Sequence, residues 1–274
     1  MNKKYFVVPH DFTPAANFAL EHAIVTAKQL HAAVYVLHVV SKEKQLKKAE
    51  DDLKEVLEKK ADQGVELIPV VRIGSIVEDI GDFAAEHHAS IVFMGTHGAH
   101  GWQHITGSKA LKVITYSSVP FVIVQDKSIK PTGYDDIVVP MDLHKETKQK
   151  LAIVANLADY FDSRVHVITP DETDEYLKEQ VQSNIAFAKK FFKGRNIELK
   201  TYVAPSAGFD KEVVKYAIQI DADLIAIMNM HKNMFFPAMT SNYEQYIITN
   251  DAKIPALVVN PIELDTYGKS VLFS

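Results

Sequence analysis

The chain contains no cysteine, no long hydrophobic run and no excess of positive charge. Without cysteine, a disulfide framework, a thiolate nucleophile and a cysteine-ligated metal site are all excluded, and nothing indicates an oxidising compartment. No apolar stretch approaches the roughly 18 residues that suggest a membrane-spanning helix, and residues 1–12 lack the pattern of a signal peptide. We therefore expect a soluble, cytoplasmic protein with no membrane partner.

The charge balance is slightly acidic. Lysine and arginine together number 30, aspartate and glutamate 35, and the formal net charge is -5. A broad nucleic-acid interface usually needs a basic face, so we expect no nucleic-acid partner. At 274 residues and 47% hydrophobic, the chain has the composition of a globular protein with room for one large or two medium domains.

Three short segments recur in the same order and at similar spacing, which indicates a tandem duplication. They are FVVPHD at 6–11 with IVVPMD at 137–142, IVFM at 91–94 with IAIM at 225–228, and VPFVIV at 119–124 with IPALVV at 254–259. We expect two domains, 1–126 and 134–262, joined by a polar linker that contains Pro131 and Gly133 and followed by a tail, 263–274.

Each half alternates short β-branched runs with segments of helical period, the pattern of a doubly wound, Rossmann-like parallel sheet. Thr13 before Pro14 predicts the start of one helix, and Ser75 is predicted to cap another. Residues 42–62 have the pattern of an amphipathic surface helix. Strands are predicted near 4–9, 33–40, 65–72, 90–95 and 119–125, and near 136–141, 164–169, 197–203, 223–228 and 255–260.

A glycine-rich segment, residues 94–109, follows the fourth predicted strand and leads into a helix. Glycines at this place let backbone N–H groups approach an anion, and the N-terminus of the following helix attracts phosphate. Asp11 ends the first strand, at the same edge of the sheet. Its carboxylate suits hydroxyls or an amine of a ribose or base, so the two features together predict a nucleotide lying across the crevice.

Two common phosphate-binding fingerprints do not fit this segment. The glycines at 101 and 107, followed by Ser108 and Lys109, are one residue too far apart for a P-loop, and the serine precedes the lysine. The glycines at 95, 98 and 101 follow the fourth strand, whereas the dinucleotide fingerprint follows the first.

The chain resembles the universal stress protein family in its tandem form, over about residues 3–260. The resemblance is carried by Val8-Pro-His-Asp11 with Phe12-Thr13, Leu37-His-Val39, Met94-Gly-Thr-His-Gly98, Gly107-Ser108 and Val119–Val124. It implies two tandem domains with the fold of adenine nucleotide alpha hydrolases, paired through their last strands as an internal pseudo-dimer. Such pairing would also cover exposed strand edges. A homodimer of whole chains is left open.

In nucleotide-binding members of this family, the residues that match Asp11 and Val39 hold the ribose and adenine, and the glycine segment approaches the phosphates. The resemblance thus implies ATP or AMP as ligand, with Mg²⁺ accompanying ATP. The family pattern places nine residues between the glycines matching Gly98 and Gly107, and this chain has eight. The implied nucleotide site comprises Pro9, Asp11, Val39, Met94, Gly95, His97, Gly98, Gly107, Ser108 and Lys109.

The second half lacks the glycines of the first. Aligned on the repeat, the positions of Gly95, Gly98, Gly101 and Gly107 are occupied by Asn229, Lys232, Phe235 and Ser241. A lysine in the left-handed conformation would cost about 1–2 kcal/mol. We therefore expect the second half to be a partner domain without a conventional ATP site.

Several alternatives stay open. His97, His100 and His104 could hold zinc, or His97 could bond within its turn while the others are exposed. Asp11 could instead bond local N–H groups at the strand end. No G-x-S-x-G elbow or placed carboxylate pair supports catalysis, so slow ATP hydrolysis is the most we expect. The leading function is a nucleotide-binding sensor or regulator of the stress response, with protein partners unknown. The alternative is a nucleotide-free scaffold or interaction protein.

Overall fold

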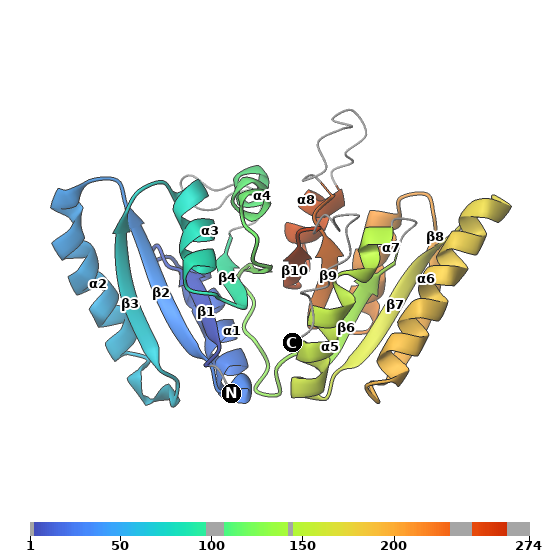
Figure 1. Ribbon diagram of the computed structural model, residues 1–274, viewed down its shortest axis with the longest axis horizontal. Helices are drawn as coiled ribbons and strands as arrows, with labels where there is room; N and C mark the ends of the chain where they lie inside the picture. The colour runs from blue at the N-terminus through green and yellow to red at the C-terminus, as the bar shows by residue number, and fades with distance from the viewer. Residues whose placement is uncertain (1–2, 97–106, 142–144, 231–242, 262–274) are drawn as a thin grey trace, which may run out of the picture.

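The computed structural model describes residues 3–96, 107–141, 145–230 and 243–261. The described strands form one sheet in the order β3-β2-β1-β4-β5-β10-β9-β6-β7-β8 (Figure 1). The strands of the first half are β1 (Tyr5–Pro9), β2 (Ala33–Val40), β3 (Leu67–Ile73), β4 (Ile91–Gly95) and β5 (Phe121–Val124). Those of the second half are β6 (Asp136–Pro140), β7 (Arg164–Asp171), β8 (Leu199–Pro205), β9 (Leu224–Met228) and β10 (Ala256–Val259). The predicted α/β fold is confirmed.

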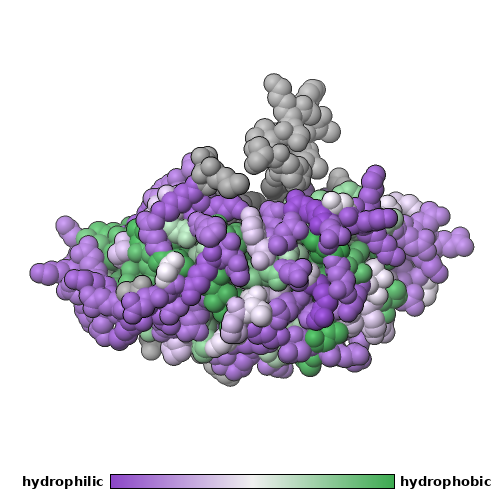
Figure 2. All heavy atoms as spheres, turned by 90° about the horizontal axis from the view of Figure 1, so that it is seen from below, coloured by the Kyte–Doolittle hydropathy of each residue, from purple (hydrophilic) through white to green (hydrophobic). Residues whose placement is uncertain are grey.

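Helices cover both faces of the sheet. Those of the first half are α1 (Pro14–Leu30), α2 (Leu46–Glu58), α3 (Ile76–Glu86) and α4 (Gly107–Tyr116). Those of the second half are α5 (Leu151–Phe161), α6 (Glu175–Lys193), α7 (Phe209–Gln219) and α8 (Tyr243–Ile248). None of the described helices combines the length and apolar character needed to cross a membrane. The face seen from below is mostly hydrophilic (Figure 2).

The two halves join through their last strands. Residues 256–258 of β10 pair antiparallel with residues 121–123 of β5, whereas every other pair of adjacent described strands is parallel. Figure 1 shows the halves meeting at the middle of the molecule. The predicted internal pairing of the last strands is confirmed.

Two hydrophobic cores run through both halves, one on each face of the sheet. The first is covered by α1, α2, α5 and α6 and includes Phe6, Phe93 and Phe161. The second is covered by α3, α4, α7 and α8 and includes Phe121 and Ile225. Because each core crosses the junction, separating the halves would expose apolar surface on both faces of the sheet.

Capping side chains mark the starts of α1 and α6, whereas α2, α3, α5 and α7 begin without a side-chain capping hydrogen bond. Thr13 caps α1 as predicted, since its side chain accepts a hydrogen bond from the N–H of Ala16 and Pro14 opens the helix. Ser75 occupies the N-cap of α3, but its side chain makes no capping hydrogen bond. Instead, the carboxylate of Asp79 accepts from the N–H of Ser75 at 2.6 Å. The amphipathic segment 42–62 is divided into α2 and two short 3₁₀ turns, η1 (Glu43–Gln45) and η2 (Ala61–Gln63).

The register of the sheet corrects the alignment of the two halves by one residue. Phe6 lies opposite Ile91, and its counterpart Ile137 lies opposite Leu224. Ile91 of β4 therefore corresponds to Leu224 of β9, one residue before the Ile225 with which the sequence alignment pairs it. Met228 is therefore the structural counterpart of Gly95, and Asn229 that of Thr96. The assignment of Asn229 to the Gly95 position was wrong because short apolar runs align equally well in adjacent registers.

Candidate functional site

Pro9, Asp11 and Val39 lie together at the carboxyl ends of neighbouring strands. Pro9 is the last residue of β1 and lies opposite Leu37 of β2. Since β1 lies between β2 and β4, this edge is the point where the strand order reverses, the usual ligand position in such sheets. The residues border one hollow of about 40 Å³, lined by Pro9, His10, Asp11, Leu37, His38, Val39, Ile76 and Ile80.

Asp11 also belongs to a local turn. Its Oδ1 accepts hydrogen bonds from the Thr13 N–H at 3.2 Å and from the Thr13 hydroxyl at 2.6 Å. Phe12 between them has a left-handed backbone with φ of 68°. Oδ1 of Asp11 therefore makes the local hydrogen bonds expected of a structural carboxylate at a strand end. The side chain is half-buried and borders the hollow.

His10 forms part of the wall of the hollow as a neutral side chain. Its Nδ1 accepts from the Phe12 N–H at 3.2 Å, and this leaves Nε2 to donate to Asn17 Oδ1 at 3.3 Å. Burial lowers the pKa of His10 to about 4, a larger effect than the hydrogen bond to Asn17 that raises it. His38 bonds the carbonyl of His10 through Nδ1 at 2.7 Å, which fixes the two strand ends to each other.

Packing alone requires a glycine at position 95. A Cβ on Gly95 would lie 2.4 Å from the backbone carbonyl carbon of Ala15, in the first turn of α1. Its counterpart Met228 has a side chain. In that half the first described element after β6 is a 3₁₀ turn, η3 (Lys145–Lys148), and α5 starts only at Leu151. Met94 points into the core and is buried.

The other predicted site residues fall in or beside the glycine segment. Gly107, Ser108 and Lys109 form the first turn of α4. His97 and Gly98 lie outside the described residues, as do His100 and His104 of the zinc alternative. Within the described ranges, no group of three or more histidine, aspartate or glutamate side chains is arranged to hold a metal ion.

Thr96 is a polar residue of this edge that sequence reasoning left out. Its hydroxyl is buried and has no hydrogen-bond partner in the described part of the chain, and the same is true of Oδ1 of its counterpart Asn229. The sequence gives threonine no signal of this kind, because a hydroxyl without a partner is visible only once its surroundings are known.

A buried lysine occupies the matching edge of the second half. Lys150 is 3% exposed, and its ammonium donates to the carbonyl of Pro140 at 2.5 Å and to the Thr147 hydroxyl at 3.0 Å. Pro140 is the counterpart of Pro9. In the second half, the Lys150 side chain therefore covers the end of β6, whereas in the first half the matching end of β1 borders the hollow. The sequence pattern did not reveal this difference.

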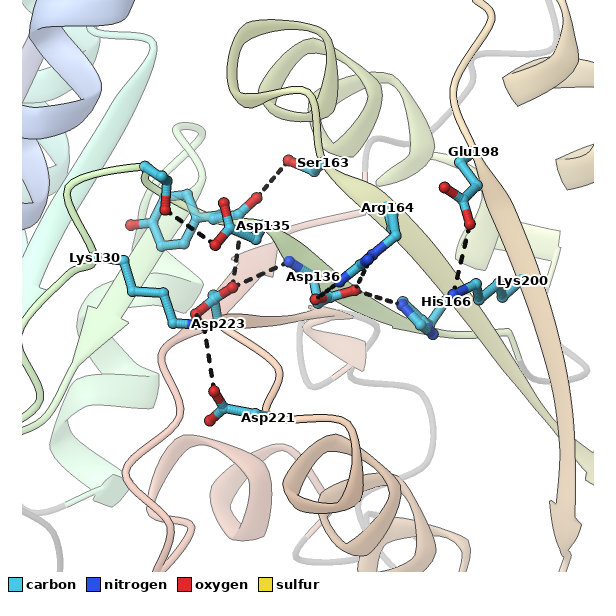
Figure 3. A network of polar contacts seen from close by, with 12 residues as sticks. Lys130, Asp135, Asp136, Ser163, Arg164, His166, Glu198, Lys200, Asp221 and Asp223 are labelled. Carbon is cyan, nitrogen blue, oxygen red and sulfur yellow. Dashed lines mark hydrogen bonds and ion pairs between the residues drawn. The ribbon is translucent and has the colours of Figure 1, made fainter.

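Charged residues also gather at the opposite edge of the sheet, where β6, β7 and β9 begin (Figure 3). Burial acts to raise the pKa of Asp136, but hydrogen bonds from Arg164 and His166 outweigh it and hold the pKa below its usual value. Arg164 Nε donates at 2.8 Å, and His166 Nε2 lies 2.8 Å from the carboxylate. The corresponding positions of the first half carry Tyr5, Ala33 and Tyr35, so this cluster is specific to the second half.

Asp223 organises the rest of this cluster. Its Oδ2 accepts from the N–H groups of Asp135 and Asp136 at 2.9 and 3.1 Å, and Lys130 lies 2.7 Å from Oδ1. The hydrogen bond with Asp223 raises the pKa of the Lys130 ammonium. Because Lys130 precedes β6 and Asp223 precedes β9, these bonds fix the segment between the halves to the second half of the sheet.

Comparison with known proteins identifies the first half. The model of the universal stress protein family matches residues 3–125. Residues 3–125 belong to the universal stress protein family. A universal stress protein of Methanocaldococcus jannaschii is 28% identical over 139 residues, covering 44% of this chain and 82% of the relative.

Solved structures extend the likeness of fold to both halves of the chain. The crystal structure of a universal stress protein from Archaeoglobus fulgidus DSM 4304 is 19% identical, covers 95% of this chain and 99% of its own, and gives a TM-score of 0.73. A functionally unknown protein from Pseudomonas aeruginosa PAO1 is 14% identical, covers 94% of this chain and 93% of its own, and gives 0.65. At these identities the likeness shows the fold alone.

Proposed function

We propose that the first universal stress protein domain binds an adenine nucleotide, ATP or AMP, and that the protein acts in the cytoplasm as a sensor or regulator rather than as a catalyst. The proposal rests mainly on one observation: Pro9, Asp11 and Val39 line the same hollow at the strand-order switch. The domain boundaries remain those proposed from the repeat, 1–126 and 134–262.

The chemistry of the hollow fits the base and sugar of a nucleotide. Val39, Ile76 and Ile80 supply apolar surface for the face of a base, and the Asp11 carboxylate can accept hydrogen bonds from ribose hydroxyls. The phosphates would then extend toward the first turn of α4, where unpaired N–H groups and the helix dipole favour negative charge. With ATP, a Mg²⁺ ion would neutralise part of the negative charge of the phosphates.

The second domain is proposed as a partner without a nucleotide of its own. The strand end that matches Pro9 is covered by Lys150, and Pro170 takes the position of Val39. The side chain of Met228 takes the place of Gly95. These three differences lie at the same edge of the sheet. They support a nucleotide site in the first half alone.

Two measurements test whether the protein binds a nucleotide. Purified protein is denatured and the released small molecules are identified, and ATP is titrated into ligand-free protein by calorimetry. Asp11→Asn keeps an oxygen for the Thr13 bonds but removes the charge, so it should weaken ATP binding by about tenfold, as expected for loss of a charged hydrogen-bond acceptor. Asp142→Asn, at the matching position of the second half, is the control and should leave the affinity unchanged.

A nucleotide-free scaffold is the second candidate, and the size of the hollow favours it. The volume of about 40 Å³ is far below the roughly 300 Å³ at which ordinary ligand pockets begin, so a base would have to displace side chains on entry. A supernatant without nucleotide, together with no heat of binding at millimolar ATP, would support the scaffold and reject the sensor.

A further inference from the structure

Two asparagines of the second half hold a helix of the first. Asn260 follows β10, and its side-chain amide donates to the carbonyls of Ile114 and Ser117 at the C-terminal end of α4. Asn229 follows β9 and donates to the Asn260 side-chain oxygen at 2.8 Å and to the Thr115 hydroxyl at 3.0 Å. Asn229 and Asn260 are 0% and 6% exposed, so these bonds form away from water, where each is costly to lose.

The reverse contact, from the first half to α8, is weaker. Gln125 follows β5 as Asn260 follows β10, and its amide donates to the carbonyl of Asn250 at 3.0 Å. Thr96, the counterpart of Asn229, is too short to continue the arrangement, and its hydroxyl has no partner among the described residues. Among the described residues, Asn229 and Asn260 make three side-chain hydrogen bonds to the C-terminal end of α4, whereas Gln125 makes one just beyond α8, so the pseudo-symmetric junction is asymmetric.

Helix α4 connects this contact to the candidate nucleotide site in two ways. Its first turn is formed by Gly107, Ser108 and Lys109. Its C-terminal end packs against α3, where a Cβ on Gly81 would lie 3.3 Å from the Cα of Ser117. The residue before Gly81 is Ile80, whose side chain lines the hollow. A displacement of α4 would therefore reach both the phosphate end and the base end of the site.

We propose that Asn229 and Asn260 are positioning residues for the nucleotide site, so that the second domain sets the nucleotide affinity of the first through α4. This inference rests on the proposed function. It gives the domain that lacks a site of its own a role in the site of its neighbour. It also predicts reciprocity: ATP binding should make the contact between α4 and the second domain harder to open.

A matched pair of variants tests the proposal in the full chain. Asn260→Ala removes an amide that donates to the carbonyl of Ile114 in α4 and to that of Ser117, the residue after α4. Asn250→Ala removes an equally buried side-chain amide that donates to the carbonyls of Ile247 and Ile254, within the second half. The variant keeps the main-chain carbonyl that accepts from Gln125. Both should lower the unfolding midpoint, but only Asn260→Ala should weaken ATP binding, by roughly 2- to 30-fold, the range of coupling free energies measured for such contacts.

Hydrogen exchange separates failure of this proposal from failure of the proposed function. Amides of α4 that are hydrogen-bonded within the helix, residues 111–116, should exchange faster in Asn260→Ala than in Asn250→Ala, with or without nucleotide. If Asn260→Ala does not fold, Asn229→Ala, which removes the bond to Thr115, takes its place. Unchanged exchange in α4, or an equal loss of ATP affinity in both variants, would overturn the positioning role. If the wild type binds no ATP, the proposed function fails, and the exchange result alone decides whether Asn260 positions α4.

Discussion

Gly95 and Ala15 are in such close backbone contact that a single added methyl group would separate β4 from α1. The nearest backbone atoms of Ala15 would lie 2.4 Å from a Cβ on Gly95, well inside van der Waals contact. The same glycine is part of the segment that sequence comparison associates with phosphate. The missing side chain of Gly95 therefore lets α1 pack against β4 whether or not a nucleotide binds.

The first prediction follows from this contact. Gly95→Ala should destabilise the protein by about 3 kcal/mol, because backbone atoms of α1 cannot move aside as a flexible side chain could. Chemical denaturation measures the loss. Gly194→Ala is the control, since a Cβ there would meet its nearest neighbour at 3.5 Å, an ordinary contact. Equal stabilities of the two variants would show that α1 shifts freely.

The second prediction concerns pH. Burial lowers the pKa of His22 to about 4, and the neutral ring lies 2.9 Å from the Tyr134 hydroxyl and 3.0 Å from the Lys127 carbonyl. Between pH 4 and the ordinary value near 6.5, the unfolded chain binds more protons than the folded one. Stability should therefore be complete above pH 6.5 and fall as the pH drops toward 4, by roughly 3 kcal/mol for this group.

His10 has a pKa lowered in the same direction and contributes in the same window. His22→Gln should therefore reduce the slope of unfolding free energy against pH without abolishing it. Urea titrations at pH 7, 6 and 5 measure that slope. A variant with the full wild-type slope would show that His22 is not the titrating group.

The third prediction compares the two carboxylates near Lys130. Asp223 is 6% exposed and accepts from two backbone N–H groups, whereas the side chain of Asp221 is 82% exposed and lies 3.4 Å from the same lysine. Asp223→Ala should cost about 3 kcal/mol because it leaves buried donors without an acceptor. Asp221→Ala should change stability by less than about 0.5 kcal/mol, as is usual for an exposed pair. Similar losses measured by denaturation would contradict the assigned network.

Much of the fold could be predicted because its signals are local. The β-branched run of β2 is bounded as expected, at Ala33 and Val40, and Thr13 with Pro14 marks the start of α1. The resemblance to the universal stress protein family also implied that β5 and β10 would pair. What the repeat could not supply was the register of β9, since a shift of one residue in an apolar run leaves its hydrophobicity unchanged while it moves each side chain to the other face.

The candidate site was predictable only in part, for a physical reason. Pro9, Asp11 and Val39 are near strand ends, and parallel strands bring such ends to one edge. Lys150 and the Asn229–Asn260 pair depend on contacts between distant parts of the chain, for which periodicity carries no information. The residue type alone does not show whether a lysine or an asparagine is buried.

The antiparallel pairing of β5 with β10 has a consequence for assembly. Two separate domains would have to find each other in solution, and their association would depend on concentration and would lose translational freedom. Here the partner strand is on the same chain, so its effective concentration is fixed by the connecting segment. Dilution therefore cannot separate the two halves, and any control that one exerts on the other is independent of how much protein the cell makes.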